Sequence, residues 1–246
     1  MLNRPVAVAP PGPERPSCAR SAVELWVLLS VFAALQIGAV AVRALLGRPH
    51  DERWFEMGLN TVAGFVLLTA VVTMVRVQRH PLASIGWRTD YPLLDVMIGI
   101  GLFLFMTAAL IALSVGMYLL APDVHERMQQ TQENIAATIP KMPPGLLVLM
   151  SAWVAVFEET VFRGFLLTRL RAMVGWWPAA VVLGAALFAP GHWYQGAIGV
   201  GFTFVLGILL GGIFAWRKSL VPVIILHFLL NTVQLLVMYE GRPDWK

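Results

Sequence analysis

Long apolar runs dominate this sequence and determine the solvent in which most of it can fold. Six of them are long enough to cross about 30 Å of hydrocarbon as a helix. They cover residues 22–46, 56–77, 93–121, 145–168, 197–216 and 220–239. A shorter run, 178–190, can span only if it continues through His192. We therefore predict an all-α fold, a polytopic membrane helical bundle of about seven transmembrane helices, with eight as the upper count.

The composition agrees with this prediction. Of the 246 residues, 58% are hydrophobic and 13% are charged, whereas a soluble domain carries about 25% charged residues. The single cysteine, Cys18, excludes a disulfide framework and a zinc cluster built on cysteines. The net charge of +4 does not indicate nucleic acid as a partner.

The sequence divides into three parts. Residues 1–21 are rich in proline and arginine and lack apolar periodicity, so we predict a disordered N-terminal tail there. Residues 22–240 form the predicted transmembrane domain, and residues 241–246 form a short C-terminal tail. Residues 122–144 are polar with a loose apolar stripe, which fits a short interfacial helix and a solvated loop equally well.

Positive charge orients the predicted spans. Cytoplasmic connections of membrane proteins carry an excess of lysine and arginine. Here these residues gather in the N-terminal tail and then on alternate connections, at Arg76, Arg79 and Arg88, at Arg169 and Arg171, and at Arg217 and Lys218. The N-terminus is therefore predicted to lie in the cytoplasm.

Two adjacent glutamates, Glu158 and Glu159, lie inside the run 145–168. Burying a carboxylate in hydrocarbon costs several kcal/mol, so an acid within a span predicts a functional site. Residues four apart share one face of a helix, whereas adjacent residues diverge by about 100°. Glu159 should therefore pair with Arg163, as structural support. Glu158 has Phe162 four residues on and no such partner, which leaves it as the candidate general base.

Two later segments carry the other candidates. His227 and Asn231 are four residues apart on the last span and present an imidazole and an amide, two donors suited to an oxyanion. His192 follows a Pro-Gly pair that should bend or end its helix. Counted at about 1.5 Å per residue from the cytoplasmic charges, Glu158 and these three side chains fall within about 10 Å of one another in depth. One shared buried site is predicted if their spans pack together.

Other classes of protein leave different signatures. The chain has no H-E-x-x-H zinc helix, because Gln129 stands where the second histidine would be. It also has no G-x-S-x-G motif and no P-loop. A non-catalytic membrane scaffold or immunity protein stays open as an alternative, and such a protein would not need Glu158. An ion-coupled transporter would also keep Glu and His at mid-membrane depth, although the internal repeats common in transporters are not evident.

Three motifs resemble those of the CPBP family of intramembrane proteases (CAAX protease and bacteriocin-processing, also called Abi). The family motifs are E-E-x-x-x-R, F-x-x-x-H and H-x-x-x-N. In this chain they read EETVFR at 158–163, FAPGH at 188–192 and HFLLN at 227–231. They occur in order, each on its own apolar segment, and place a protease core at 145–235.

The resemblance implies a CAAX-protease-like endopeptidase that cleaves near the C-terminus of a membrane-embedded or lipid-anchored protein or peptide. It assigns water activation to Glu158 and His192, oxyanion stabilisation to His227 and Asn231, and structural support to Glu159 and Arg163. It also implies a multi-pass integral protein of the plasma membrane of a bacterium.

Two matters stay open at this point. Members of the family have been described both as metalloproteases and as metal-free glutamate proteases. A zinc ion held by Glu158, His192 and His227 and a metal-free mechanism are therefore both open. Eukaryotic members trim prenylated proteins, whereas similar bacterial chains are linked to bacteriocin processing or immunity, so prenylation of the substrate is open too.

Overall fold

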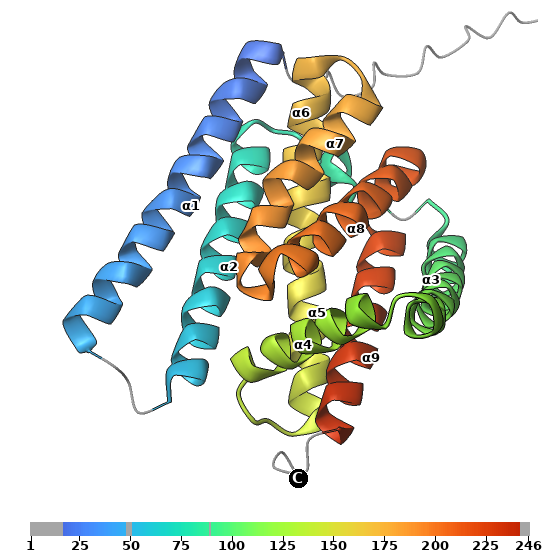
Figure 1. The fold of residues 1–246 in the computed structure, drawn as a ribbon. Helices are drawn as coiled ribbons and strands as arrows, with labels where there is room; N and C mark the ends of the chain where they lie inside the picture. Colours follow the sequence, from blue (N-terminus) through green and yellow to red (C-terminus); the bar gives the residue numbers. More distant parts are fainter. Residues whose placement is uncertain (1–16, 48–50, 89, 242–246) are drawn as a thin grey trace, which may run out of the picture.

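The computed structural model describes residues 17–47, 51–88 and 90–241, and all regular structure within them is helical (Figure 1). The longer helices are α1 (Cys18–Leu46), α2 (Glu52–Val77), α3 (Pro92–Leu120), α8 (Gly196–Arg217) and α9 (Val221–Glu240). The shorter helices are α4 (Pro122–Thr138), α5 (Pro144–Glu158), α6 (Leu167–Val174) and α7 (Trp177–Phe188). Two 3₁₀ segments, η1 (Leu82–Ile85) and η3 (Ala189–Gln195), and one π-helix, η2 (Glu159–Leu166), complete the order. The all-α prediction is confirmed for this part of the chain.

Six helical runs among the described residues are long and apolar enough to cross a membrane, so the chain is a multi-pass integral membrane protein. These runs are Cys18–Leu46, Glu52–Val77, Pro92–Leu120, Pro144–Val174, Trp177–Arg217 and Val221–Glu240. The sequence predicted seven because it counted 178–190 and 197–216 separately. In the structure η3 joins these two segments into one helical run.

This joined run folds back on itself. A Cβ placed on Gly207 of α8 would lie 3.0 Å from the Cβ of Ala185 in α7, and one on Gly211 would lie 3.1 Å from Val181. From Gly207 to Gly211 the chain advances along α8, while the contacted residue moves back from Ala185 to Val181 in α7. The two helices are therefore antiparallel. Small residues allow such close packing of helices in a membrane. The pair therefore forms a hairpin with η3 at its tip.

The first helix begins earlier than the sequence predicted. Its N-cap is Ser17, whose side chain accepts a hydrogen bond from the backbone N–H of Arg20 at 3.3 Å. Residues 18–21, predicted as the end of the tail, are therefore helical. Residues 1–16 and 242–246 lie outside the described residues. The polar segment after α3 is helical over Pro122–Thr138, which decides between the two forms open for it.

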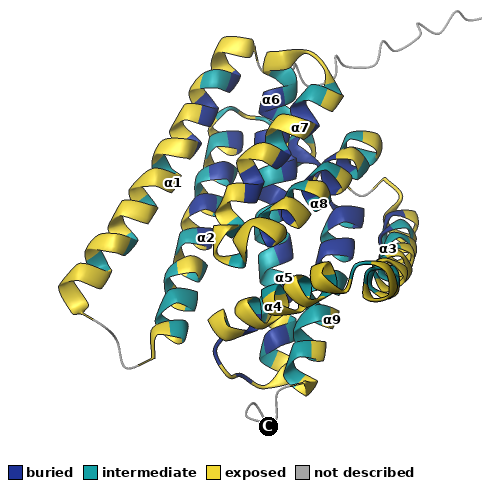
Figure 2. Ribbon diagram, viewed as in Figure 1, coloured by how far each residue is buried: buried dark blue, intermediate teal, exposed yellow. Residues whose placement is uncertain are grey.

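The continuous run of α5, η2 and α6 passes through the middle of the molecule (Figure 1). On one side, Val161 and Phe165 pack against apolar residues of α1, α2 and η1. On the other side, Leu166, Leu167 and Leu170 pack against α7, α8 and α9. Figure 2 shows that most of α1 and α3 is exposed instead, and their surface is apolar, as lipid contact requires. The two glutamates thus lie on a helical run that is packed on two sides.

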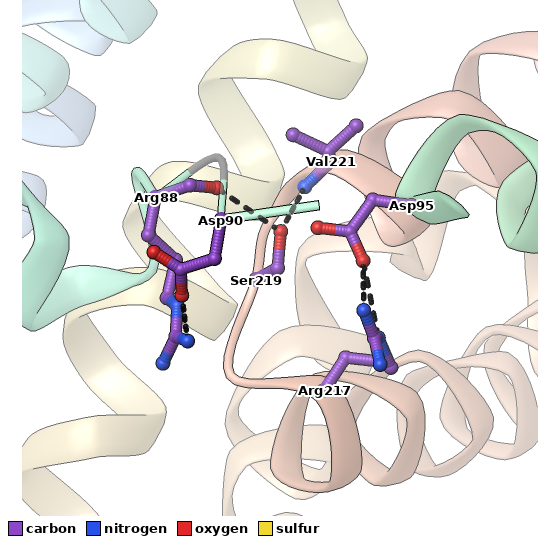
Figure 3. Close-up of polar contacts among 6 residues, drawn as sticks. All are labelled: Arg88, Asp90, Asp95, Arg217, Ser219 and Val221. Carbon is purple, nitrogen blue, oxygen red and sulfur yellow. Dashed lines mark hydrogen bonds and ion pairs between the residues drawn. The ribbon is translucent and has the colours of Figure 1, made fainter. Parts of the chain in front are cut away.

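A polar clasp fixes the start of α9, the helix that carries His227 (Figure 3). The backbone N–H of Leu220 donates to the carbonyl of Gly86 at 2.9 Å. Ser219 donates its hydroxyl to the carbonyl of Arg88 at 3.4 Å and accepts from the N–H of Val221 at 3.3 Å. Beside it, Arg217 forms an ion pair with Asp95 of α3 at 2.5 Å. The clasp ties the loop between α8 and α9 to the loop before α3.

Substituting Gly164 by alanine should destabilise this arrangement. A Cβ at this position would lie 2.7 Å from the backbone carbonyl oxygen of Ile85 in η1, which cannot rotate away. Forcing a methyl group into a packed interior costs about 1–3 kcal/mol. Thermal unfolding in detergent should therefore begin at a lower temperature for Gly164→Ala. Gly212→Ala is the matched control, since a Cβ there meets nothing within 4 Å, and an equal effect of both would contradict the packing argument.

Candidate active site

The two glutamates lie where the central helix changes its winding. α5 ends at Glu158, and the next eight residues form the π-helix η2. A π-helix is rare and is frequently found at functional sites. Threonine side chains bond to helix carbonyls near its two ends: Thr160 donates to Val156 at 2.6 Å, and Thr168 donates to Gly164 at 2.7 Å. These bonds help the bundle to tolerate an irregular helix in an apolar setting.

Glu159 is fully buried and holds two partners with one oxygen. Its Oε1 accepts from the Arg163 guanidinium at 2.9 Å, the ion pair that the spacing predicts. The same oxygen lies 2.7 Å from Nδ1 of His227, on a helix 68 residues further along the chain. An ionised carboxylate can only accept hydrogen bonds, so His227 donates to it from Nδ1. Glu159 therefore fixes the orientation of the imidazole.

His227 lies between the two glutamates. With Nδ1 bound to Glu159, its other nitrogen, Nε2, lies 3.9 Å from Oε2 of Glu158. This distance is too long for a direct hydrogen bond, and it suits two groups that share a water molecule or a substrate atom. The side chain of Glu158 is 16% exposed, whereas that of Glu159 is 0% exposed. Glu158 is therefore the more accessible of the two carboxylates.

His192 reaches the cluster through an aromatic ring. It lies at the tip of the α7–α8 hairpin with non-helical backbone angles, φ −104° and ψ 20°, as the preceding Pro-Gly pair predicts. Its ring centroid is 4.8 Å from that of Phe188, and the guanidinium of Arg163 lies 4.4 Å from the centre of the same Phe188 ring. The charges of Glu158 and Arg163 also act on His192. The first and last residues of the F-x-x-x-H motif thus contact each other, and Phe188 connects the motif to the ion pair.

Asn231 is partly buried on α9, one turn beyond His227. Within the described part of the chain its amide makes no hydrogen bond with another side chain, so both of its N–H donors are available. The structure therefore brings Glu158, Glu159, Arg163 and His227 into one group, with His192 joined through Phe188. Asn231 lies on the same helix as His227, and no hydrogen bond joins its side chain to another described member of the group.

The residues do not form a ready metal site. Among the described residues, no three or more His, Cys, Asp or Glu side chains lie in an arrangement that could hold a metal ion. The ligand set that the resemblance left open, Glu158 with His192 and His227, is not assembled in this conformation.

Sequence reasoning missed two contacts between separate segments of the chain. The bond from His227 to Glu159 joins two spans, and no spacing rule within one helix predicts it. Arg169, assigned to a cytoplasmic connection, is buried and pairs with Glu24 of α1 at 2.6 Å. The single acidic residue in the run 22–46 was a signal for this pair, since a buried carboxylate needs a partner.

One of the comparisons with known proteins gives a match. Residues 140–233 match the family model described as Rce1-like, type II CAAX prenyl endopeptidase. The match includes all three motifs and coincides closely with the predicted protease core at 145–235. No curated protein and no solved structure matches the chain. Residues 140–233 therefore form a domain of the Rce1-like type II CAAX prenyl endopeptidase family, which is a family of proteases.

Proposed function

We propose that the chain is an intramembrane endopeptidase that cleaves near the C-terminus of a membrane-embedded or lipid-anchored protein or peptide. The family supplies the reaction class, hydrolysis of a peptide bond in a protein substrate. One observation carries the proposal for this chain: Oε2 of Glu158 lies 3.9 Å from Nε2 of His227, whose imidazole Glu159 holds in place. An accessible carboxylate beside a fixed imidazole can hold and activate a water molecule.

In the proposed reaction, Glu158 takes a proton from a water molecule that His192 also binds. The water oxygen attacks the carbonyl carbon of the scissile peptide, and the carbonyl oxygen becomes an oxyanion. Glu158 then returns the proton to the leaving amine as the carbon–nitrogen bond breaks. A single carboxylate acts first as base and then as acid, so the proton balance closes without another group.

His227 and Asn231 are the proposed donors to the oxyanion. His227 can donate from Nε2 while Nδ1 donates to Glu159 only if the ring carries both protons. Its Nε2–H and the free amide of Asn231 then face the oxyanion from one side.

Replacing Asn231 with alanine should slow turnover by about 10²–10³-fold, the usual loss for one oxyanion donor. The expected result is a small residual rate with an unchanged pH optimum, because the base is still present. Initial rates over a range of pH would measure this. A shifted pH profile with an unchanged maximal rate would mean that Asn231 tunes a neighbouring acid or base, and the oxyanion assignment would be abandoned.

The membrane arrangement is part of the proposal. We place the N-terminus in the cytoplasm, from the alternating positive charge, and count α7 and α8 as separate membrane segments, which supports the seven predicted from the sequence. The antiparallel contacts of Gly207 and Gly211 favour this count. The transmembrane domain then covers 22–240 with the protease core at 145–235. The membrane is proposed to be the bacterial plasma membrane.

The reaction class can be tested with the full chain in membranes or detergent. Two substrates should be offered, a farnesylated peptide with a CAAX end and an unmodified membrane-anchored protein from the same genomic neighbourhood. Mass spectrometry of the products would locate the cleaved bond. Cleavage of either substrate near its C-terminus by the wild type, and not by Glu158→Gln, would support the proposal. Equal processing by both proteins would favour a contaminating protease and a non-catalytic scaffold role.

A further inference from the structure

Tyr194 stands beside the proposed site and has no part in the three family motifs. It lies two residues after His192 in η3. The two rings stack, with centroids 6.1 Å apart and planes inclined by 29°. The charge of the Glu158 carboxylate also acts on the phenol. Tyr194 is 45% exposed, so the rest of the chain does not cover it. An exposed phenol whose ring stacks on His192 is accessible to a bound peptide.

The hydrogen bond that Tyr194 accepts leaves its phenolic O–H able to donate to another group. The side-chain amide of Gln195 donates to the phenol oxygen at 3.2 Å. The hydroxyl of Thr203 in α8 donates in turn to the carbonyl oxygen of the Gln195 amide at 3.5 Å, which fixes which way the amide faces. A phenol has one O–H to donate and can also accept. Here the accepting side is occupied, and within the described residues the O–H donates to no other group.

The two hydrogen bonds run in the same direction. Thr203 of α8 donates to Gln195, and Gln195 donates to Tyr194 at the hairpin tip. Successive hydrogen bonds of one direction polarise one another, which makes the terminal phenol a better donor. We propose that Tyr194 contacts the substrate, and that its O–H donates a hydrogen bond to a peptide carbonyl lying against Glu158 and His192. This inference rests on the proposed protease function.

The alternative is that Tyr194 is an interfacial residue at the membrane surface and has no role in catalysis. Tyrosine and tryptophan gather where a bilayer meets water, and Trp193 beside it is also exposed. A purely interfacial tyrosine needs no ordered donor behind it, and removing its hydroxyl would not change turnover. The two readings therefore differ in what Tyr194→Phe does to catalysis, because phenylalanine keeps the ring that stacks on His192.

The decisive experiment compares Tyr194→Phe with wild type, with Gln195→Met and with the double variant. We expect Tyr194→Phe to lower kcat/KM by about 3- to 10-fold, the net contribution of one neutral hydrogen bond, at an unchanged unfolding temperature. Gln195→Met should give a smaller loss, and it should add nothing in the Tyr194→Phe background. Tyr118→Phe is the control, since that ring packs against His125 of α4.

Each outcome separates the two proposals. Normal kcat/KM in Tyr194→Phe, with cleavage still dependent on Glu158, would overturn the role of Tyr194 and leave the protease assignment intact. Fully additive losses in the double variant would also overturn it, because Gln195 would then act by another route. Absence of Glu158-dependent cleavage in the wild type would overturn the proposed function, and this inference with it.

Discussion

Glu158→Gln should abolish cleavage and leave the amount of folded protein in the membrane unchanged. Among the described residues the side chain forms no ion pair with an arginine or lysine, and Nε2 of His227 lies 3.9 Å from its Oε2. Glutamine keeps the shape of the side chain but cannot take up a proton. General acid–base catalysis contributes about 10²–10⁴-fold to a rate, and the loss of rate here should lie at the upper end of that range. Mass spectrometry of the substrate would measure it, with size-exclusion chromatography in detergent reporting the folded fraction.

Glu133→Gln is a suitable control for Glu158→Gln. It makes the same change on the exposed side of α4 and should alter neither cleavage nor folding. Glu158→Gln that still cleaves at the wild-type rate would remove the proposed base. Loss of folded protein equal to that of Glu159→Gln would contradict the different tasks assigned to the two neighbouring glutamates.

Glu159→Gln should instead destabilise the protein by about 3–5 kcal/mol, the usual effect of removing one partner from a buried ion pair. The carboxylate is fully buried and one of its oxygens holds both Arg163 and His227. Without its charge, the guanidinium stays buried with no compensating carboxylate, and the imidazole loses the acceptor that orients it. Thermal unfolding and membrane yield should both fall, and the remaining folded protein should have reduced activity.

Glu24→Gln separates the two effects of Glu159→Gln. Glu24 also belongs to a fully enclosed ion pair, with Arg169 at 2.6 Å, but it contacts no residue of the site. This variant should lose stability to a similar degree and keep full activity per folded molecule. If Glu159→Gln also kept full activity per folded molecule, the proposed anchoring of His227 by Glu159 would be refuted.

Local rules predicted much of the fold and one contact of the site. Apolar runs located the long helices because a bilayer requires about 20 apolar residues per span. The pairing of Glu159 with Arg163 follows from residues four apart on a helix, and it survives in the π-helix. The bend before His192 follows from proline and glycine chemistry. Each of these depends on neighbours within one segment.

The contacts between segments could not be obtained in this way. The bond from His227 to Glu159 depends on how α9 packs against the central run, and no periodicity encodes that. The π-helix was not predicted either, because its stability comes from surrounding packing and from threonine bonds rather than from a sequence signal of its own. The need for glycine at position 164 can be recognised only once η1 is known to lie against it.

The short helix before His192 has a consequence for how a reaction that consumes water can proceed inside a lipid phase. α7 has 12 residues, a length of about 18 Å, well short of the about 30 Å of hydrocarbon. Its end, and η3 with it, therefore lies at a depth where lipid would normally surround the chain. Irregular backbone at such depth requires protein or water beside it. Gly191 and Trp193 are not covered by the described chain, so under the proposed function the hairpin tip is where water would have to enter the bilayer to reach the bond to be cut.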